Sequence, residues 1–252
     1  MPARTAIKAA IAMLAGWVAL SALAACSIDV GALQHRTNSY SLSGQLHTLV
    51  VNAHVGSVHI TGSGSGQVLV TERISFRGTA PGTTHRAAAG TATLDSNCPA
   101  LETCTVGYDI TVPTAMTIRV SSNVGEIQLQ SLSGQVTAHT NAGIITLGSV
   151  SGPVEATGDA GSILGQDVSS PRATLHSSAG TIDVTFSAAP ATVTATSDIG
   201  SVTLRVPGNL SYNVTTHVGV GSTHVGVPRS TASPHAITAS TRTGSVTIEP
   251  AP

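Results

Sequence analysis

Five glycines recur at intervals of nine residues in the middle of the chain, and each is followed two positions later by an isoleucine or a valine. They are Gly125, Gly134, Gly143, Gly152 and Gly161. Nine residues are enough for one short strand and a tight turn, but not for a strand, a helix and two loops. A unit of this size cannot bury its apolar face alone, so it must stack on neighbouring units. The spacing therefore predicts an all-β repeat architecture.

Two kinds of strand alternate along the repeat. The first has the pattern Gly-x-(Ile/Val)-x-(Leu/Val), as in 143–147, and the second ends in a small residue, as in 134–138. Steps from the second kind to the first are always nine residues, whereas the opposite steps vary from nine to eleven. A coil explains this asymmetry more directly than an antiparallel meander if its connections have a fixed length at one edge and a variable length at the other. We call the edge with the fixed length the tight edge. We therefore predict a flattened β-solenoid with two short strands per coil of 18–20 residues, stacked at a spacing of ~4.8 Å.

The alternation of apolar and polar residues predicts which side chains line the interior of this solenoid. One interior column is expected to contain Ile127, Ile145, Ile163, Ile182 and Val202. A second column is expected to contain Leu129, Leu147, Val184 and Leu204, with an interruption at Gly165. Residues 71–112 depart from the repeat and contain longer strand patterns, which predict an antiparallel insertion or cap near the N-terminal end of the solenoid.

The first residues are typical of an export signal. Arg4 and Lys8 precede an apolar stretch that is short for a membrane span, and Leu23-Ala24-Ala25 leads directly to Cys26. This arrangement resembles the bacterial lipobox, in which the cysteine is lipidated, with palmitate among the acyl chains, and becomes the first mature residue. An ordinary secretory signal beside a chance cysteine is the alternative. We expect a signal peptide at 1–25, a lipidated N-terminus and short linker at 26–44, and a single solenoid domain at 45–252.

Charge and cysteine content narrow the classes of function. Without residues 1–25, nine arginines stand against twelve acidic residues, a net charge of about −3. This balance argues against nucleic acid as a partner, because such binding depends on neutralising phosphates. Outside the membrane, Cys98 and Cys104 are expected to form a disulfide, and no second cysteine pair is present to complete a metal site. We expect neither a metal nor a cofactor.

The ordered patterns along the chain resemble the putative-adhesin family of bacterial cell-envelope domains. The resemblance covers roughly residues 45–249 and rests on the Gly-x-(Ile/Val)-x-(Leu/Val) ladder at 125–204, on Val112-Pro113 with Ile118 and Val120, on Leu204-Arg205-Val206-Pro207 with Tyr212 and Val214, and on the closing Thr243-Gly244-Ser245-Val246-Thr247-Ile248. It implies a β-solenoid. It implies no established activity and no catalytic residues.

Polar residues recur two positions before the glycine of each first-type strand, at Asn123, Asn141, Asp159, Ser178 and Asp198. Stacked coils would place them in a row along the tight edge. Oxygen ligands in a row suit Ca²⁺. The alternative is turn chemistry, because Asn and Asp tolerate left-handed backbone and bond to their own backbone. The chain lacks the Gly-Gly-x-Gly-x-Asp pattern of calcium-binding nonapeptides, so we favour turn chemistry.

Histidines offer a second candidate ligand set. His139 and His176 occupy matching positions two coils apart, which places them ~10 Å from each other, too far to share one zinc ion. Exposed strand histidines are the simpler interpretation.

Three functions remain compatible with these features of the sequence. The first is a non-catalytic, lipid-anchored module for adhesion or scaffolding at the outer face of the cell membrane, with an unknown protein or cell-wall polymer as partner. The second is an envelope-sensing or signalling accessory protein that binds a membrane partner. The third is a glycan-active enzyme, which is disfavoured because the outward acids Glu126, Glu155 and Asp183 are scattered and such enzymes need clustered carboxylates.

Overall fold

The computed structural model describes residues 32–99 and 103–252, which belong to one compact unit of the chain. Within these residues the secondary structure consists of strands, with no α-helix, and so no helix is available to cross a membrane. The expected signal peptide and the expected lipidation site at Cys26 lie outside the described residues.

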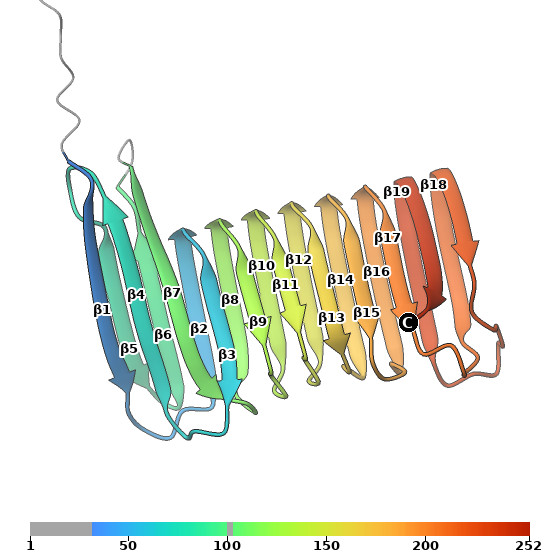
Figure 1. Ribbon diagram of the computed structural model, residues 1–252, viewed down its shortest axis with the longest axis horizontal. Coiled ribbons are helices and arrows are strands. Elements are labelled where there is room, and N and C mark those ends of the chain that lie inside the picture. Colours follow the sequence, from blue (N-terminus) through green and yellow to red (C-terminus); the bar gives the residue numbers. More distant parts are fainter. Residues whose placement is uncertain (1–31, 100–102) are drawn as a thin grey trace, which may run out of the picture. The chain divides into compact units, whose positions relative to one another are not determined.

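The centre of the unit is a stack of five coils, each made of two strands that lie in opposite sheets (Figure 1). We call the sheet that contains the first strand of each coil sheet 1 and the other sheet 2. The coils are β8 Thr117–Val124 with β9 Ile127–Gln130, β10 Val136–Ala142 with β11 Ile145–Gly148, β12 Val154–Ala160 with β13 Ile163–Val168, β14 Arg172–Ala179 with β15 Ile182–Phe186, and β16 Thr192–Ile199 with β17 Val202–Val206. Every strand pairs in parallel with its counterparts in the neighbouring coils. The predicted flattened β-solenoid is confirmed.

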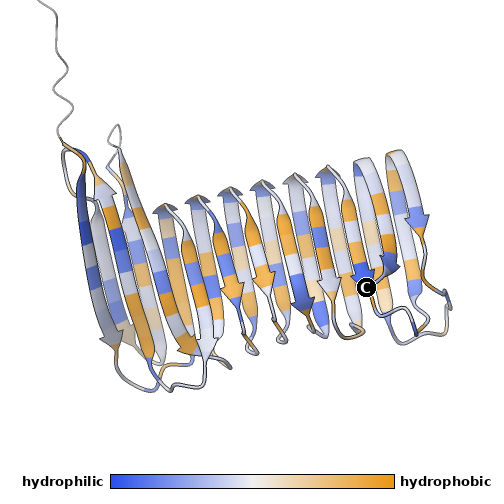
Figure 2. Cartoon of the chain, in the orientation of Figure 1, coloured by the Kyte–Doolittle hydropathy of each residue, from blue (hydrophilic) through white to orange (hydrophobic). Residues whose placement is uncertain are grey.

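Both predicted interior columns are in register. The first column pairs Ile127 with Ile145 and continues in order to Val202, and all five of its side chains are fully buried. In the second column Gly165 lies between Leu147 and Val184. A bulge follows it, and Val168 then pairs with Phe186, so larger buried side chains fill the space beside the glycine. Figure 2 shows the alternation of apolar and polar residues along these strands.

The coils at the N-terminal side do not follow chain order. The coil of β2 Thr48–Val55 and β3 Val58–Ser63 lies between β8 and β9 on one side and β6 Thr91–Asn97 and β7 Cys104–Pro113 on the other. All of these pairings are parallel. The expectation of an antiparallel insertion over the whole of 71–112 is therefore corrected, because β6 and β7 form a regular coil of the solenoid.

An antiparallel cap covers this coil, as predicted for the N-terminal end. It consists of β1 Gln34–Leu42 and β4 Val68–Phe76 in sheet 2 and β5 Gly82–Ala88 in sheet 1. The expected linker at 26–44 is too long, since residues 34–42 pair with β4 along the whole of β1. The predicted disulfide between Cys98 and Cys104 is present and spans the connection from β6 to β7, with a Cα–Cα distance of 5.7 Å.

At the C-terminal side, too, the order of the strands in the stack differs from their order in the chain. The long strands β18 Asn213–Val225 and β19 Ala236–Pro250 each run through both sheets. The last strand, β19, pairs with β16 and β17 on one side and with β18 on the other. The earlier strand β18 therefore ends the stack (Figure 1).

Candidate functional site on the outer face of sheet 1

The outer face of sheet 1 carries two columns of polar side chains, because alternate residues of each strand point away from the interior. One column contains His139, Thr157, His176, Thr196 and Ser240, and the other contains Thr137, Glu155, Thr174, Thr194 and Thr238. The residues between them, such as Ala138 and Ala195, are buried. Hydroxyl and imidazole groups therefore repeat at the spacing of parallel strands over several coils.

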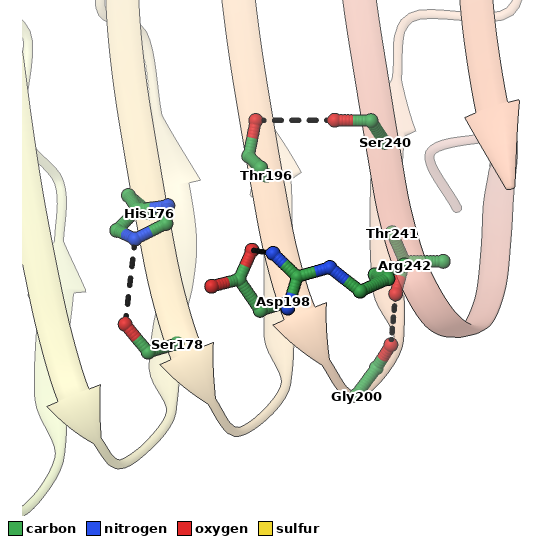
Figure 3. Close-up of polar contacts among 8 residues, drawn as sticks. All are labelled: His176, Ser178, Thr196, Asp198, Gly200, Ser240, Thr241 and Arg242. Carbon is green, nitrogen blue, oxygen red and sulfur yellow. Dashed lines mark hydrogen bonds and ion pairs between the residues drawn. The ribbon is translucent and has the colours of Figure 1, made fainter. Parts of the chain in front are cut away.

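His139 and His176 lie in one column with Thr157 between them, so they are separated by two coils as the sequence predicts. Each is within hydrogen-bond distance of the second residue after it in the same strand. The Nε2 of His139 is 2.8 Å from the Oδ1 of Asn141, and the Nε2 of His176 is 3.5 Å from the Oγ of Ser178 (Figure 3). These histidines therefore orient local polar groups and do not converge on one point.

The candidate ligand residues of the tight edge lie beside the turns. Asp198 accepts from Arg242 of β19 at 3.4 Å (Figure 3). Asn123, Asp159 and Asn141 occupy equivalent places in their coils, between register pairs such as Thr140 with Gly158 and Ala142 with Ala160. Within 32–99 and 103–252 no three His, Cys, Asp or Glu residues are close enough to hold a metal ion. The side chains of Asn141 and Asp198 at this edge contact His139 and Arg242, respectively.

The interpretation of these residues as left-handed turn residues needs correction. The positive φ angles at this edge belong to the glycines that follow, for example 145° at Gly125 and 143° at Gly200. Left-handed non-glycine residues occur at the opposite edge instead, at Ser131, Ser149 and Asp167. Ser149 donates to Asp167 at 2.8 Å, and hydrogen bonds from Ser187 and Ser149 lower the pKa of the Asp167 carboxyl.

The glycines of the tight edge touch one another through the stack. A Cβ added to any of them would overlap with the carbonyl oxygen of the residue in the adjoining coil, for example Gly143 with Gly125 and Gly161 with Gly143. Close backbone approach therefore requires glycine here. We call this row the glycine ladder; it contains Gly56, Gly125, Gly143, Gly161, Gly180, Gly200, Gly244 and Gly221.

Buried hydroxyls support the glycine ladder from inside, and the sequence analysis missed them. Ser177 donates to the carbonyl oxygen of Gly161 at 2.8 Å, Ser197 to that of Gly180 at 2.9 Å, and Thr241 to that of Gly200 at 2.9 Å. Each hydroxyl residue stands three positions before a ladder glycine. The same spacing recurs at Ser122 and Thr140, whose hydroxyl oxygens are buried without a hydrogen-bond partner in the described structure. That recurrence was the signal available in the sequence.

A hollow with a volume of about 350 Å³ lies on sheet 2, near the cap. Gly107 forms part of its lining, together with His59, Arg73 and Asp109. The Oδ1 of Asp109 is 3.2 Å from the Nδ1 of His59, and its Oδ2 pairs with Arg73. The charges in this hollow are therefore matched with each other. The sequence analysis did not predict this cluster, because its members come from β3, β4 and β7, which are distant in the chain.

His54 has a structural role beside the disulfide. Its Nδ1 accepts a hydrogen bond from the backbone N–H of Cys98 at 3.2 Å, and its own N–H donates to the Oγ of Ser96 at 3.2 Å. These bonds tie the start of the disulfide loop to β2. The outward acids that were weighed for catalysis remain separated, and Asp183 is paired with Arg205, which also contacts Glu249 at 2.8 Å.

Several solved structures are similar to this chain. One is described as a putative adhesin from Bacteroides fragilis, with 16% identity, a TM-score of 0.50, and coverage of 85% of this chain and 97% of the other. Another is described as a putative cell adhesion protein from Clostridium sporogenes, with 9% identity, a TM-score of 0.38, and coverage of 86% and 100%. At these identities the first likeness concerns the fold alone, and no curated protein matches the sequence. The family model described as Toastrack DUF4097 matches residues 43–249, and this chain belongs to that family.

Proposed function

We propose that this chain is a non-catalytic binding module, anchored by lipid at Cys26 to the outer face of the cell membrane, where it acts in adhesion or as a scaffold. The observation that carries the proposal is the pair of polar columns on sheet 1. Their hydroxyl groups repeat from coil to coil in register, as in Thr174, Thr194 and Thr238. A repeating polar face of this kind matches an extended polymer or a flat protein surface better than a small molecule.

Three features are consistent with this function. In the hollow near the cap, Asp109 already contacts both His59 and Arg73. Of the outward acids, Glu155 lies within one polar column of the face, whereas Asp183 is paired with Arg205 on the other sheet. The similar structure from Bacteroides fragilis is itself described as a putative adhesin, and we extend that description to this chain as part of the proposal.

Lipid anchoring is tested by metabolic labelling of the full-length chain with a palmitate analogue. We expect label in the mature protein and recovery in the membrane fraction, and we expect both to be lost in Cys26→Ala. Label in the alanine variant, or a released and unlabelled wild-type protein, would contradict the anchor.

Binding by the polar face is tested with cells that display the full-length chain and with purified cell-wall polymer. Thr174→Glu combined with Thr194→Glu places charge on the face of sheet 1, and we expect it to weaken attachment at least tenfold. Thr146→Glu on the outer face of sheet 2 is the matched control and should bind as the wild type does. Equal loss in both variants, or no attachment by the wild type, would contradict the proposal, and recovery of one stoichiometric membrane protein would favour an envelope-sensing role instead.

A further inference from the structure

The two ends of the solenoid are closed to different degrees. At the N-terminal end, Tyr40 of β1 and His85 of β5 come from opposite sheets and stack with a centroid distance of 4.2 Å. This ring pair covers the space between the sheets. Solenoids need such covering at both ends, because the last coil otherwise exposes its interior and its strand edge.

At the C-terminal end, the interior finishes in an incompletely covered row on β18. Val214, Val218 and Val225 are only half-buried, whereas the residues that they pair with in β19 include the fully buried Ile237 and Ile248. Val220, at 68% exposed, adds an apolar side chain to the outer surface of this strand, because it pairs with Thr243 in the same exposed column as Ile199. The apolar interior therefore reaches the surface at β18.

The backbone of β18 is also open along one edge. Its ladder pairings in the described structure are all with β19. On its other edge, segment 228–230 pairs with Tyr212 just before β18 begins, and from Val214 onward no strand of the described residues lies beside this edge. Strand edges in soluble proteins are usually protected by charge, proline or a bulge. The thirteen residues of β18 contain no Asp, Glu, Lys, Arg or Pro. Nothing in this strand opposes the addition of another strand.

We propose that β18 is a self-association edge, onto which β18 of a second copy of this chain adds in antiparallel orientation to form a two-fold, end-to-end dimer. The charge and the shape of the β18 edge both favour a second copy of this chain as the partner that binds there. The strand contains no Asp, Glu, Lys or Arg, so the edge meets a second copy of itself without repulsion between such charges. A second β18 also offers the same pair of edges, one in each sheet, and the same half-buried valines.

The two-fold arrangement is favoured over a head-to-tail chain of copies. The opposite end of the stack is covered by the Tyr40–His85 pair, and its outer strands carry Arg36 in β1 and Arg86 in β5. A two-fold contact uses the same surface on both partners and closes after one addition, whereas a head-to-tail contact continues into a filament. The dimer buries both incompletely covered ends and leaves the capped ends facing outward.

The test measures the mass of the full-length chain in detergent as a function of concentration. We expect a monomer–dimer equilibrium and slower amide exchange over residues 213–225 at high concentration. Thr215→Lys combined with Val220→Lys introduces charge at two exposed positions of β18, and should weaken dimerisation tenfold or more while leaving the melting temperature unchanged. The matched control is Ile199→Lys, because Ile199 is 61% exposed but lies in the middle of the stack.

Retention of the dimer in the control and its loss in the β18 variant would support the proposal. It is overturned if the wild type is monomeric at every concentration, if amide exchange at 213–225 is independent of concentration, if the double lysine variant dimerises normally, or if species longer than dimers form. The exchange measurement does not depend on a variant, so it decides the question even if the lysines disturb folding.

Discussion

The hydroxyl of Ser177 donates a hydrogen bond of 2.8 Å to the carbonyl oxygen of Gly161, which belongs to the preceding coil. The same relationship links Ser197 to Gly180. The two contacts join the interior of one coil to the turn of the preceding coil, at the place where the backbones approach too closely for any side chain. The glycine ladder and the buried hydroxyls therefore form one support for the tight edge, and its parts can be tested separately.

Replacing a ladder glycine should destabilise the protein strongly. In Gly161→Ala the new Cβ would overlap with the carbonyl oxygen of Gly143, and the backbones of two coils must separate. We expect a loss of about 3 kcal/mol of unfolding free energy, the upper end of the usual overpacking cost, measured by urea denaturation. Gly66→Ala is the control, because its Cβ would meet nothing within 4 Å, and equal effects in both variants would argue against the ladder.

Filling the gap that Gly158 leaves in the hydroxyl row of the central coils should stabilise the protein. Gly158 stands three positions before Gly161, where other coils have Ser or Thr, and a Cβ there meets only ordinary contacts, the nearest at 3.5 Å. A serine would place its hydroxyl near the carbonyl oxygen of Gly143. We expect Gly158→Ser to add about 1 kcal/mol to the unfolding free energy. Gly158→Ala separates the backbone contribution from the hydrogen bond, and a serine no better than alanine would contradict the predicted bond.

The stack of coils from β8 to β17 could be predicted because each coil repeats the spacing of Gly125 and Ile127 in the next. The order of the outer coils could not. All coils present similar interior columns, so β2 and β3 fit beside β8 as well as a sequence neighbour would, and only packing of the whole chain selects this order. The insertion of β19 between β17 and β18 has the same cause.

The same limit applies to the contacts of the candidate site: those within the repeat could be predicted, and those between distant parts of the chain could not. The columns that contain His139 and His176 could be deduced from residue spacing within the repeat. The pairing of Asp198 with Arg242 could not, because it joins residues 44 positions apart through the unexpected position of β19. The Arg73–Asp109 pair likewise depends on the antiparallel contact between β4 and β7.

The cap should loosen when Tyr40 loses its hydroxyl. The Tyr40 hydroxyl donates to the Oε1 of Glu72 at 2.6 Å, and Glu72 is 1% exposed, with Asn38 as its other donor at 3.1 Å. We expect Tyr40→Phe to lower the unfolding free energy by roughly 1.5–3 kcal/mol, as for a bond to a buried charged group, and to speed amide exchange in β1. Tyr212→Phe removes a hydroxyl bond to Pro207 at the other end, and faster exchange of β1 in that control would contradict a local effect.

Stability should fall in alkaline solution because of the buried tyrosines. Burial raises the pKa of Tyr108 from its ordinary value of 10.0 to about 12, and burial together with the bond to Glu72 raises the pKa of Tyr40 further. A raised pKa in the folded state means that the unfolded chain loses the phenolic proton first. The contribution of Tyr108 is therefore complete below pH 10 and disappears as the pH rises towards 12, with a magnitude of about 2–3 kcal/mol. We expect the unfolding free energy to be flat between about pH 8 and 9.5 and to decline above it. Tyr108→Phe should make the decline shallower, whereas an equally steep decline in that variant would assign the alkaline transition to other groups.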